Sequence, residues 1–299
     1  MLKRFTIIGN CQADALSEFL LSNQTLKNTY EYISYTPIFK MTSDELDRLY
    51  TDILPILDLI IIQPISHNYN NNYKYSTKSI LNAVNKNCLK ILFPSLFFDY
   101  YHPFNIYISD KNQPGWKLGD PYDYHDKNIL SSFIQFQSEE GALNKYYEVL
   151  YNPDLLTAHF FNEALLKNIN NLKERELKYT DYCTEDTNII NSSQFIMEYY
   201  DKMLLFYSIN HPTKYLFYYI ANSCLIYLNI PLETYPEDID PLKSLVMPVY
   251  MCLQKCLKFD ISYYLNFRHY KILLDDKETI RKYYEGYRKT DRNVLQSNL

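Results

Sequence analysis

Short apolar runs alternate with helical patterns through the first hundred residues, and this alternation constrains the fold more than any other feature of the sequence. The run at residues 5–8 ends at Gly9, the only glycine among those hundred, and apolar residues then recur at helical spacing. Further strands are predicted at residues 30–35, 59–62 and 89–93, with helices between them. The run 59–62 is continuous rather than alternating, which is typical of a parallel strand that helices cover on both faces. The pattern therefore predicts an α/β fold with an open, mostly parallel sheet flanked by helices.

The alternation stops after residue 100, and we expect the chain to divide near there. Glycine and proline gather in a predicted loop at 110–124, and the helical pattern that follows breaks at Asn152-Pro153. The apolar run 203–207 is predicted to return to the sheet as a fifth strand, ahead of a helix from Lys214 and, later, helices kinked at Pro248. We assign four parts: an α/β core at 1–109 and 201–230, a helical insertion at 110–200, C-terminal helices at 231–287 and a polar tail at 288–299.

Charge and apolar content narrow the functional classes. The formal net charge is −5, so the sequence lacks the basic excess that is typical of nucleic-acid-binding proteins. The most apolar stretch, residues 53–62, contains Asp58 and is about half as long as the roughly twenty residues that a membrane-spanning helix needs. The N-terminal residues lack the pattern of a secretory signal, so a cytoplasmic location with reduced cysteines is expected.

The six cysteines show neither the density of a disulfide framework nor the paired Cys-x-x-Cys spacing of a metal site. Two of them, Cys252 and Cys256, lie one helical turn apart and fit either two small apolar residues on a buried helix face or a metal site. We prefer the apolar interpretation and expect no metal. The cysteines are Cys11, Cys88, Cys183, Cys224, Cys252 and Cys256.

Polar residues follow the predicted strands at their carboxyl ends. In open parallel sheets ligands bind at that edge, because the loops converge there and helix N-termini point at the crevice. We therefore expect a binding site formed by the loops that carry Gly9-Asn10-Cys11-Gln12, Gln63-Pro64, Pro94-Ser95 and Asn210-His211-Pro212-Thr213.

Cys11 is expected to enter the first turn of a helix, where unpaired backbone N–H groups stabilise an anion. Such a position lowers the pKa of a thiol below its usual value of about 8.5, which raises the thiolate fraction at neutral pH. The residue would then mark an active centre. The alternative is a buried cysteine without reactivity.

His211 precedes a proline, which places Pro212 at the first position of the next predicted helix. The positive end of that helix is expected to lower the pKa of His211 and to keep the imidazole neutral, as a general base requires. The alternative is a capping or core histidine. His102 is a second polar group at the edge of the fourth strand.

A thiol and an imidazole on neighbouring strand ends form the nucleophile and base of acyl transfer. The N–H groups of Cys11 and Gln12, with the amide of Asn10 or Gln63, are expected to stabilise the oxyanion, although each amide also fits an ordinary turn residue. Gly-x-Gly-x-x-Gly and the Walker pattern are absent, which disfavours a dinucleotide or ATP site of those types.

Three segments together resemble the WcbI family: Ile-Ile-Gly-Asn-Cys-Gln-Ala near the N-terminus, Ile-Ile-Gln-Pro after a strand, and the later Asn-His-Pro-Thr. The resemblance covers the strand-end segments from about residue 5 to residue 216. Members of that family are regarded as coenzyme A-dependent acetyltransferases of polysaccharide biosynthesis. The resemblance implies that Cys11 is the reactive thiol and His211 its base, with acetyl-coenzyme A as donor and a capsular or other surface glycan as acceptor.

The arrangement also looks like a distant variant of the Gly-Asp-Ser hydrolase architecture, with Asn-Cys in place of Asp-Ser. It departs from that pattern because Ile209 and Asn210, rather than an aspartate, precede His211. The site is then either a catalytic dyad without an orienting carboxylate or a triad completed by a distant carboxylate such as Asp99.

Three functions remain at this point. The leading one is transfer of an acetyl group from acetyl-coenzyme A to a sugar hydroxyl, and the others are a cysteine-dependent esterase or thioesterase and a non-catalytic glycan- or nucleotide-binding protein. Besides the catalytic pair Cys11 and His211, we predict two groups of contact residues. The expected oxyanion and substrate contacts are Asn10, Gln12, Gln63, Ser95 and Thr213, and the expected cofactor contacts are Gly9, His102 and Lys214.

Overall fold

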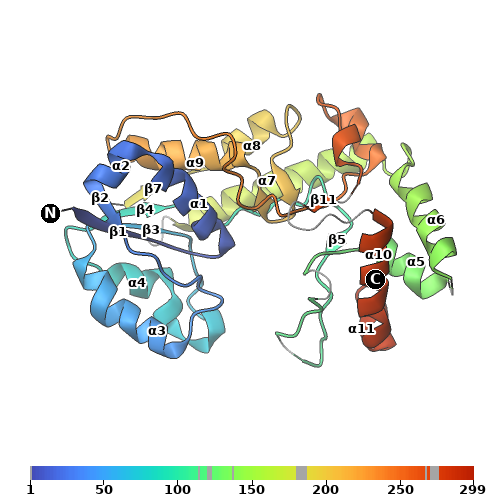
Figure 1. The fold of residues 1–299 in the computed structure, drawn as a ribbon, viewed down its shortest axis with the longest axis horizontal. Coiled ribbons are helices and arrows are strands. Elements are labelled where there is room, and N and C mark those ends of the chain that lie inside the picture. The colour runs from blue at the N-terminus through green and yellow to red at the C-terminus, as the bar shows by residue number, and fades with distance from the viewer. Residues whose placement is uncertain are drawn as a thin grey trace. The chain divides into compact units, whose positions relative to one another are not determined.

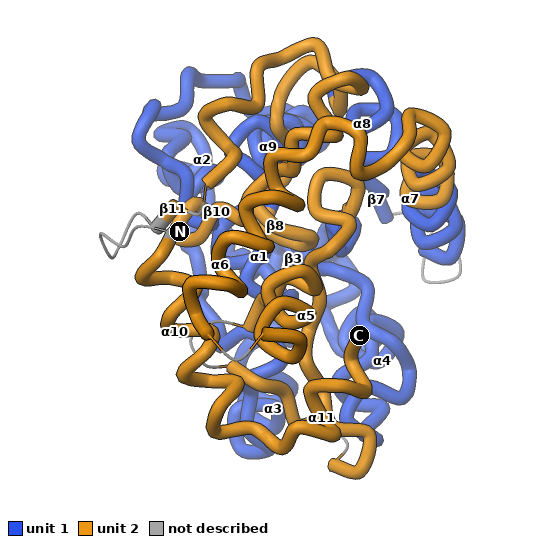
Figure 2. The backbone as a smooth tube through the Cα atoms, turned by 90° about the vertical axis from the view of Figure 1, so that its right-hand side faces the viewer, with its two compact units in different colours: residues 1–97, 169–199, 212–242 blue, residues 98–168, 200–211, 243–299 orange. Residues whose placement is uncertain are grey.

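The structure is a computed structural model that describes residues 2–113, 115–119, 123–136, 138–179, 187–266, 268–269 and 276–299. Cys183 and two prolines of the predicted loop, Pro114 and Pro121, lie outside the described residues. The chain divides into two units, coloured separately in Figure 2. Unit 1 comprises Met1–Phe97, Ile169–Tyr199 and Pro212–Leu242, and unit 2 comprises Phe98–Asn168, Tyr200–His211 and Lys243–Leu299.

Unit 1 contains a five-stranded sheet in the order β2-β1-β3-β4-β7, and all of its strand pairs are parallel. The register places Ile7 opposite Ile61 and Ile61 opposite Ile91, so the central strands present a continuous apolar layer. The predicted α/β fold with an open parallel sheet is therefore confirmed. The strands are β1 (Lys3–Ile8), β2 (Tyr30–Tyr32), β3 (Leu59–Ile62), β4 (Leu89–Leu92) and β7 (Thr187–Ile189).

Helices cover both faces of this sheet, with α1 and α9 on one face and α3 and α4 on the other (Figure 1). Phe19 of α1 stacks on Phe217 of α9 with 5.4 Å between ring centroids, which joins the two helices of the first face. On the other side, α3 begins with a capping box formed by Thr42 and Glu45. The helices of unit 1 are α1 (Cys11–Ser22), α2 (Gln24–Thr29), α3 (Ser43–Arg48), α4 (Thr77–Ala83), α8 (Ser193–Tyr199) and α9 (Lys214–Tyr227), with short η1 to η4 at Leu49–Ile53, Leu54–Ile56, Tyr69–Asn71 and Tyr73–Tyr75.

The fifth strand of the sheet is not the one predicted from the sequence. Residues 203–207 do not return to the sheet, because Phe206–Ser208 (β8) pairs with His211–Pro212 (β9) in a separate two-stranded sheet. The fifth position belongs to β7, which lies within the predicted helical insertion and pairs with Lys90–Leu92 of β4. The segment Thr-Asn-Ile carries no apolar run, so its strand conformation arises from pairing with β4 rather than from local pattern.

Helices make up most of the regular secondary structure of unit 2. The long helix α7 (Ala158–Lys178) continues from unit 2 into the residues of unit 1 after Asn168. The other helices of unit 2 are α5 (Lys127–Gln135), α6 (Glu139–Leu150), α10 (Asp276–Lys289) and α11 (Arg292–Gln296), with short η6 (Met251–Cys256) and η7 (Ser262–Tyr264). Its short strands are β5 (Asn105–Ile106), β6 (His125–Asp126), β8, β10 (Leu245–Val246) and β11 (Arg268–His269).

One prediction for the C-terminal region is wrong. Leu245 and Val246 form a strand with β11 instead of a helix, since two consecutive apolar residues fit either structure until a partner strand is known. The segment assigned as a polar tail contains helices that the sequence did not predict: α10 extends to Lys289, and α11 follows with Asp291 as its N-cap. Leu295 is buried and anchors α11, and one buried leucine is too weak a signal to reveal a helix in a polar segment.

Among the residues that the structure describes, no helix is long and apolar enough to cross a membrane.

The central strand β3 gives a test of this core. Ile61 is fully buried between β1 and β4, so Ile61→Ala should lower the free energy of unfolding by about 2–5 kcal/mol through lost contacts and a residual cavity. Leu89→Ala on β4 is the matched control. Because that side chain is 40% exposed, its truncation should lower the free energy of unfolding much less. Urea denaturation of the two variants measures the difference, and equal losses would contradict the buried position of β3.

Candidate active site

The turn after β1 places Cys11 at the first residue of α1, as predicted. Asn10 is the N-cap, with extended backbone angles, and its side-chain Oδ1 accepts a hydrogen bond from the N–H of Gln12 at 2.9 Å. The chain thus changes from strand to helix over two residues, Gly9 and Asn10. This fixes the thiol at the N-terminal end of a twelve-residue helix.

Gly9 is required at this turn because another side chain occupies the space of a Cβ atom. A Cβ added at Gly9 would lie 2.5 Å from Oε1 of Gln63, closer than real Cβ contacts. The same Oε1 accepts a hydrogen bond from the N–H of Asn10 at 3.0 Å. The amide of Gln63 therefore lies against the backbone of the turn, which is possible only next to glycine.

Two buried glutamine side chains connect the loops that follow β1, β3 and β4. Gln63 donates from Nε2 to Oε1 of Gln12 at 2.8 Å and to the carbonyl of Pro94 at 3.3 Å. Gln12 donates from Nε2 to the carbonyl of Leu96 at 2.8 Å, and its Oε1 accepts from the N–H of Leu96 at 3.0 Å. Because both side-chain amides are engaged within the loops, we assign them a positioning role in place of the expected contact with an oxyanion.

Arg175 also holds the loop after β4, although it belongs to no recognisable sequence motif. Its Nη1 donates to the carbonyl of Ser95 at 3.0 Å and its Nη2 to the carbonyl of Phe97 at 3.3 Å. Ser95, predicted as a substrate contact, thus engages its backbone carbonyl in positioning the loop. An arginine on α7 is eighty residues away in the sequence, so only the fold reveals the contact.

The thiol of Cys11 is less acidic than the sequence suggested. Burial raises its pKa above the ordinary value, and the negative charge of Asp14 raises it further. The backbone N–H groups of Cys11 and Gln12 and the positive charge of Lys40 act in the opposite direction but do not compensate. The helix N-terminus therefore exerts the predicted effect, yet desolvation exceeds it, and the expectation of a lowered pKa is wrong in direction.

His211 lies in unit 2 and is partly buried, and the resulting desolvation lowers its pKa to about 4. The imidazole is therefore neutral at neutral pH, as predicted, but the cause differs. Pro212 belongs to β9 rather than to the first turn of a helix, and α9 begins at Lys214 with the buried Thr213 as its N-cap. The predicted helix start at Pro212, which was expected to lower the pKa of His211, is therefore absent.

Tyr124 sets the tautomer of His211. Its hydroxyl donates to Oδ1 of Asn210 and lies 3.0 Å from Nε2 of His211. A phenol has one proton, so the bond to His211 requires Nε2 to carry hydrogen and to donate to Tyr124. Nδ1 then has the lone pair of a base, and among the described residues this buried atom has no hydrogen-bond partner.

Tyr124, rather than a carboxylate such as Asp99, orients the imidazole of His211. Asp99 instead accepts a hydrogen bond from Nδ2 of Asn168 at 2.6 Å and holds α7. Tyr124 is one of 32 tyrosines and lies 87 residues from His211, so no local pattern could identify it.

His102 and Lys214, the two side chains predicted to contact the cofactor, differ in their exposure. His102 is 2% exposed, and its ring nitrogens lie 3.2 Å and 3.3 Å from the carbonyls of Pro248 and Phe206. A histidine enclosed in this way cannot reach a ligand, so the prediction for His102 is wrong. Lys214 donates from Nζ to the carbonyl of Glu237 at 3.1 Å, an exposed contact at the start of α9. Within the described ranges, no cluster of three potential metal-ligating side chains occurs.

The influence of Asp14 on the thiol can be tested directly. Asp14→Asn removes a negative charge that raises the pKa of Cys11, so the pKa should fall and alkylation by iodoacetamide should be faster at neutral pH. The rate is measured against pH by mass spectrometry of the Cys11 peptide. Asp44→Asn, in the first turn of α3, is the control and should leave the profile unchanged. An unchanged profile in Asp14→Asn would contradict this electrostatic account.

Comparisons with known proteins agree with this architecture. A solved structure described as WcbI, a novel polysaccharide biosynthesis enzyme, in its native form without a disulfide bond between coenzyme A and one of its cysteines, has a TM-score of 0.83. The two sequences are 22% identical, and the match covers 100% of this chain and 94% of the other, which shows a shared fold. No curated protein matches the chain. The family described as "Polysaccharide biosynthesis enzyme WcbI" matches residues 4–233, well over half of the sequence, and the protein therefore belongs to the WcbI family of polysaccharide biosynthesis enzymes.

Proposed function

We propose that the protein is a coenzyme A-dependent acyltransferase that moves an acetyl group from acetyl-coenzyme A to a sugar hydroxyl in polysaccharide biosynthesis. The observation that carries the proposal is the position of Cys11, whose thiol lies beside the backbone N–H groups at the start of α1 in a member of this family. The similar solved structure supports the choice of donor, because its description names coenzyme A together with a cysteine of that protein.

The charge states of the two proposed catalytic residues complement each other. The raised pKa of Cys11 means that little thiolate exists at neutral pH, so attack on a thioester requires a base. His211 has the properties of such a base, because its imidazole is neutral and its Nδ1 has the lone pair. A base that is uncharged at rest takes up a proton during the reaction and returns it afterwards.

Two routes are compatible with these groups. In the first, Nδ1 of His211 takes the thiol proton, the sulfur of Cys11 attacks the thioester carbonyl, and coenzyme A leaves with that proton as a thiol. His211 next takes the proton of the sugar hydroxyl, whose oxygen attacks the acetyl-cysteine, and the C–S bond breaks as the proton returns to the sulfur of Cys11. In the second route, His211 deprotonates the sugar hydroxyl, which attacks acetyl-coenzyme A directly, and coenzyme A leaves as a thiol with that proton. In both routes, N–H groups at the start of α1 are proposed to stabilise the oxyanion.

Intact-protein mass spectrometry after mixing with acetyl-coenzyme A distinguishes the routes. The first route predicts an added acetyl group that is absent in Cys11→Ala, because the thiol carries the intermediate. Cys256→Ala is the matched control, since Cys256 is also partly exposed, and it should still be acetylated.

A protein that binds coenzyme A without gaining the acetyl group would favour direct transfer. Failure to bind coenzyme A at all, measured by calorimetry, would overturn the proposed function. Turnover of simple esters without coenzyme A would indicate a hydrolase instead.

The role of His211 predicts an unusual pH dependence. Since burial lowers its pKa to about 4, the neutral base persists through mildly acidic conditions, and kcat should fall only as the pH drops through about 4. Tyr124→Phe removes the acceptor for Nε2–H and should lower the plateau of kcat with little change in KM. Steady-state kinetics from about pH 3 upward measure both effects.

The conservative variant Tyr107→Phe is the control for Tyr124→Phe, because Tyr107 packs against Tyr124 with 5.4 Å between ring centroids. It should retain the plateau. Nitrogen chemical shifts of His211 report the tautomer independently of activity, and hydrogen on Nδ1 in the unmodified protein would contradict the assigned base. A fall of kcat to half of its plateau near about pH 6.5, the ordinary pKa of histidine, would contradict the assigned base as well.

A further inference from the structure

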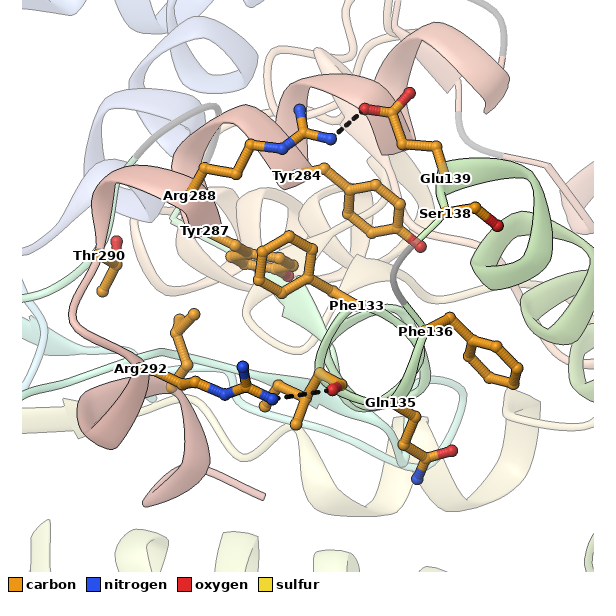
Figure 3. Close-up of a pocket in the computed structure, with 12 residues that line it drawn as sticks. Phe133, Gln135, Phe136, Ser138, Glu139, Tyr284, Tyr287, Arg288, Thr290 and Arg292 are labelled. Atoms are coloured by element: carbon orange, nitrogen blue, oxygen red, sulfur yellow. Dashed lines mark hydrogen bonds and ion pairs between the residues drawn. The ribbon is translucent and has the colours of Figure 1, made fainter.

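A cavity of about 470 Å³ in unit 2 lies apart, in sequence, from all residues assigned to catalysis. Residues from the end of α5 and the start of α6 form one wall, and residues of α10 and α11 form the other (Figure 3). Its volume is within the range of sites that bind small molecules. The lining residues that matter here are Phe133, Glu139, Tyr284, Arg288 and Arg292.

Tyr284 contributes a hydroxyl that the protein itself does not satisfy. The side chain is 1% exposed, and among the described residues its buried Oη has no hydrogen-bond partner. In Figure 3 its ring extends from α10 toward the segment of Ser138 and Glu139. Burial and the charge of Glu139 raise the pKa of Tyr284, so the hydroxyl keeps its proton and can donate. An unpaired polar group at the wall of a cavity indicates a place for a ligand's acceptor.

Two arginines line the cavity, and they differ in their partners. Arg288 pairs through Nη2 with Oε1 of Glu139, whereas Arg292 donates from Nη2 to the carbonyl of Ile134 at 3.3 Å (Figure 3). Within the described part of the chain, Arg292 has no acidic partner, so its charge is not neutralised by a neighbour. A guanidinium with several unused N–H donors suits a carboxylate or a phosphate.

Aromatic side chains line part of the same cavity. Phe133 lies 5.2 Å from Tyr284 and 5.3 Å from Tyr287, measured between ring centroids, and is only half-buried. Flat aromatic surface of this kind accommodates the apolar C–H face of a sugar ring, while polar groups at the edge bind its substituents.

We propose that this cavity is a binding site for an anionic monosaccharide unit, a pyranose that carries a carboxylate or a phosphate. The anion binds Arg292, the ring packs on Phe133, and an oxygen of the sugar accepts the hydrogen bond from Tyr284. The proposal does not depend on the chemistry of Cys11, so a protein without acyltransferase activity could still bind the sugar here.

The test is ligand-observed saturation-transfer NMR on the full chain. The probes are glucuronate, galacturonate, glucose 1-phosphate and mannose 1-phosphate, with neutral glucose and inorganic phosphate for comparison. We expect at least one uronate or sugar phosphate to bind more tightly than either comparison ligand, with the affinity falling as salt is added. The two kinds of anionic sugar distinguish a carboxylate site from a phosphate site.

Two variants locate the bound sugar. Arg292→Gln should weaken binding by about tenfold or more, because it removes a charge-assisted hydrogen bond. Tyr284→Phe should also weaken binding but should not lower Tm, because the oxygen it removes has no partner among the described residues. This combination separates a ligand contact from a structural role.

Arg281→Gln is the matched control, since Arg281 also lies on α10 but lines a neighbouring cavity and pairs with Glu278. It should bind the sugar normally. Loss of binding in Arg281→Gln with retention in Arg292→Gln would place the sugar in the neighbouring cavity and overturn the proposal. So would the absence of binding by every anionic sugar, or equal binding of glucose or of inorganic phosphate.

Discussion

The hydrogen bonds between the side chains of Gln12 and Gln63 are the interaction on which the rest of the candidate site depends. They join the loops after three adjacent strands. Both side-chain amides are buried, and each donates and accepts hydrogen bonds within these loops. Such buried networks are stabilising only when every member is satisfied, so the geometry tolerates little change. The same network requires glycine at position 9, because only a residue without a side chain leaves room for Gln63. Cys11 is thus positioned by groups that need not touch a substrate.

The two proposed catalytic groups are both held in their uncharged forms by burial, but different contacts orient them. Cys11 is placed by the backbone, at the first residue of a helix whose N-cap is Asn10. His211 is placed by a side chain, since Tyr124 accepts from one ring nitrogen and leaves the other as a base. Uncharged groups in a desolvated environment have no ionic attraction to lose before the reaction starts. A charge that develops during the reaction interacts strongly with nearby dipoles there, because little water screens it.

The sequence predicted those elements whose signals are local. β1, β3, β4 and the turn at Cys11 were recoverable because apolar runs, a single glycine and a capping residue lie next to one another in the chain. β7 was not, because its strand conformation depends on pairing with β4. The direction of the pKa shift of Cys11 was also missed, since desolvation depends on packing around the turn rather than on the turn itself. Tyr124 and Arg175 act across long sequence separations, which no periodic pattern reports.

The protonated state of Cys11 at rest has a consequence for oxidation. Disulfide exchange and reaction with peroxides proceed through the thiolate, so a thiol whose pKa is raised by burial is protected between turnovers. Coenzyme A ends in a thiol of its own, and a mixed disulfide with the enzyme would block the proposed reaction. A residue that becomes nucleophilic only when a base takes its proton combines slow oxidative inactivation with reactivity toward a thioester.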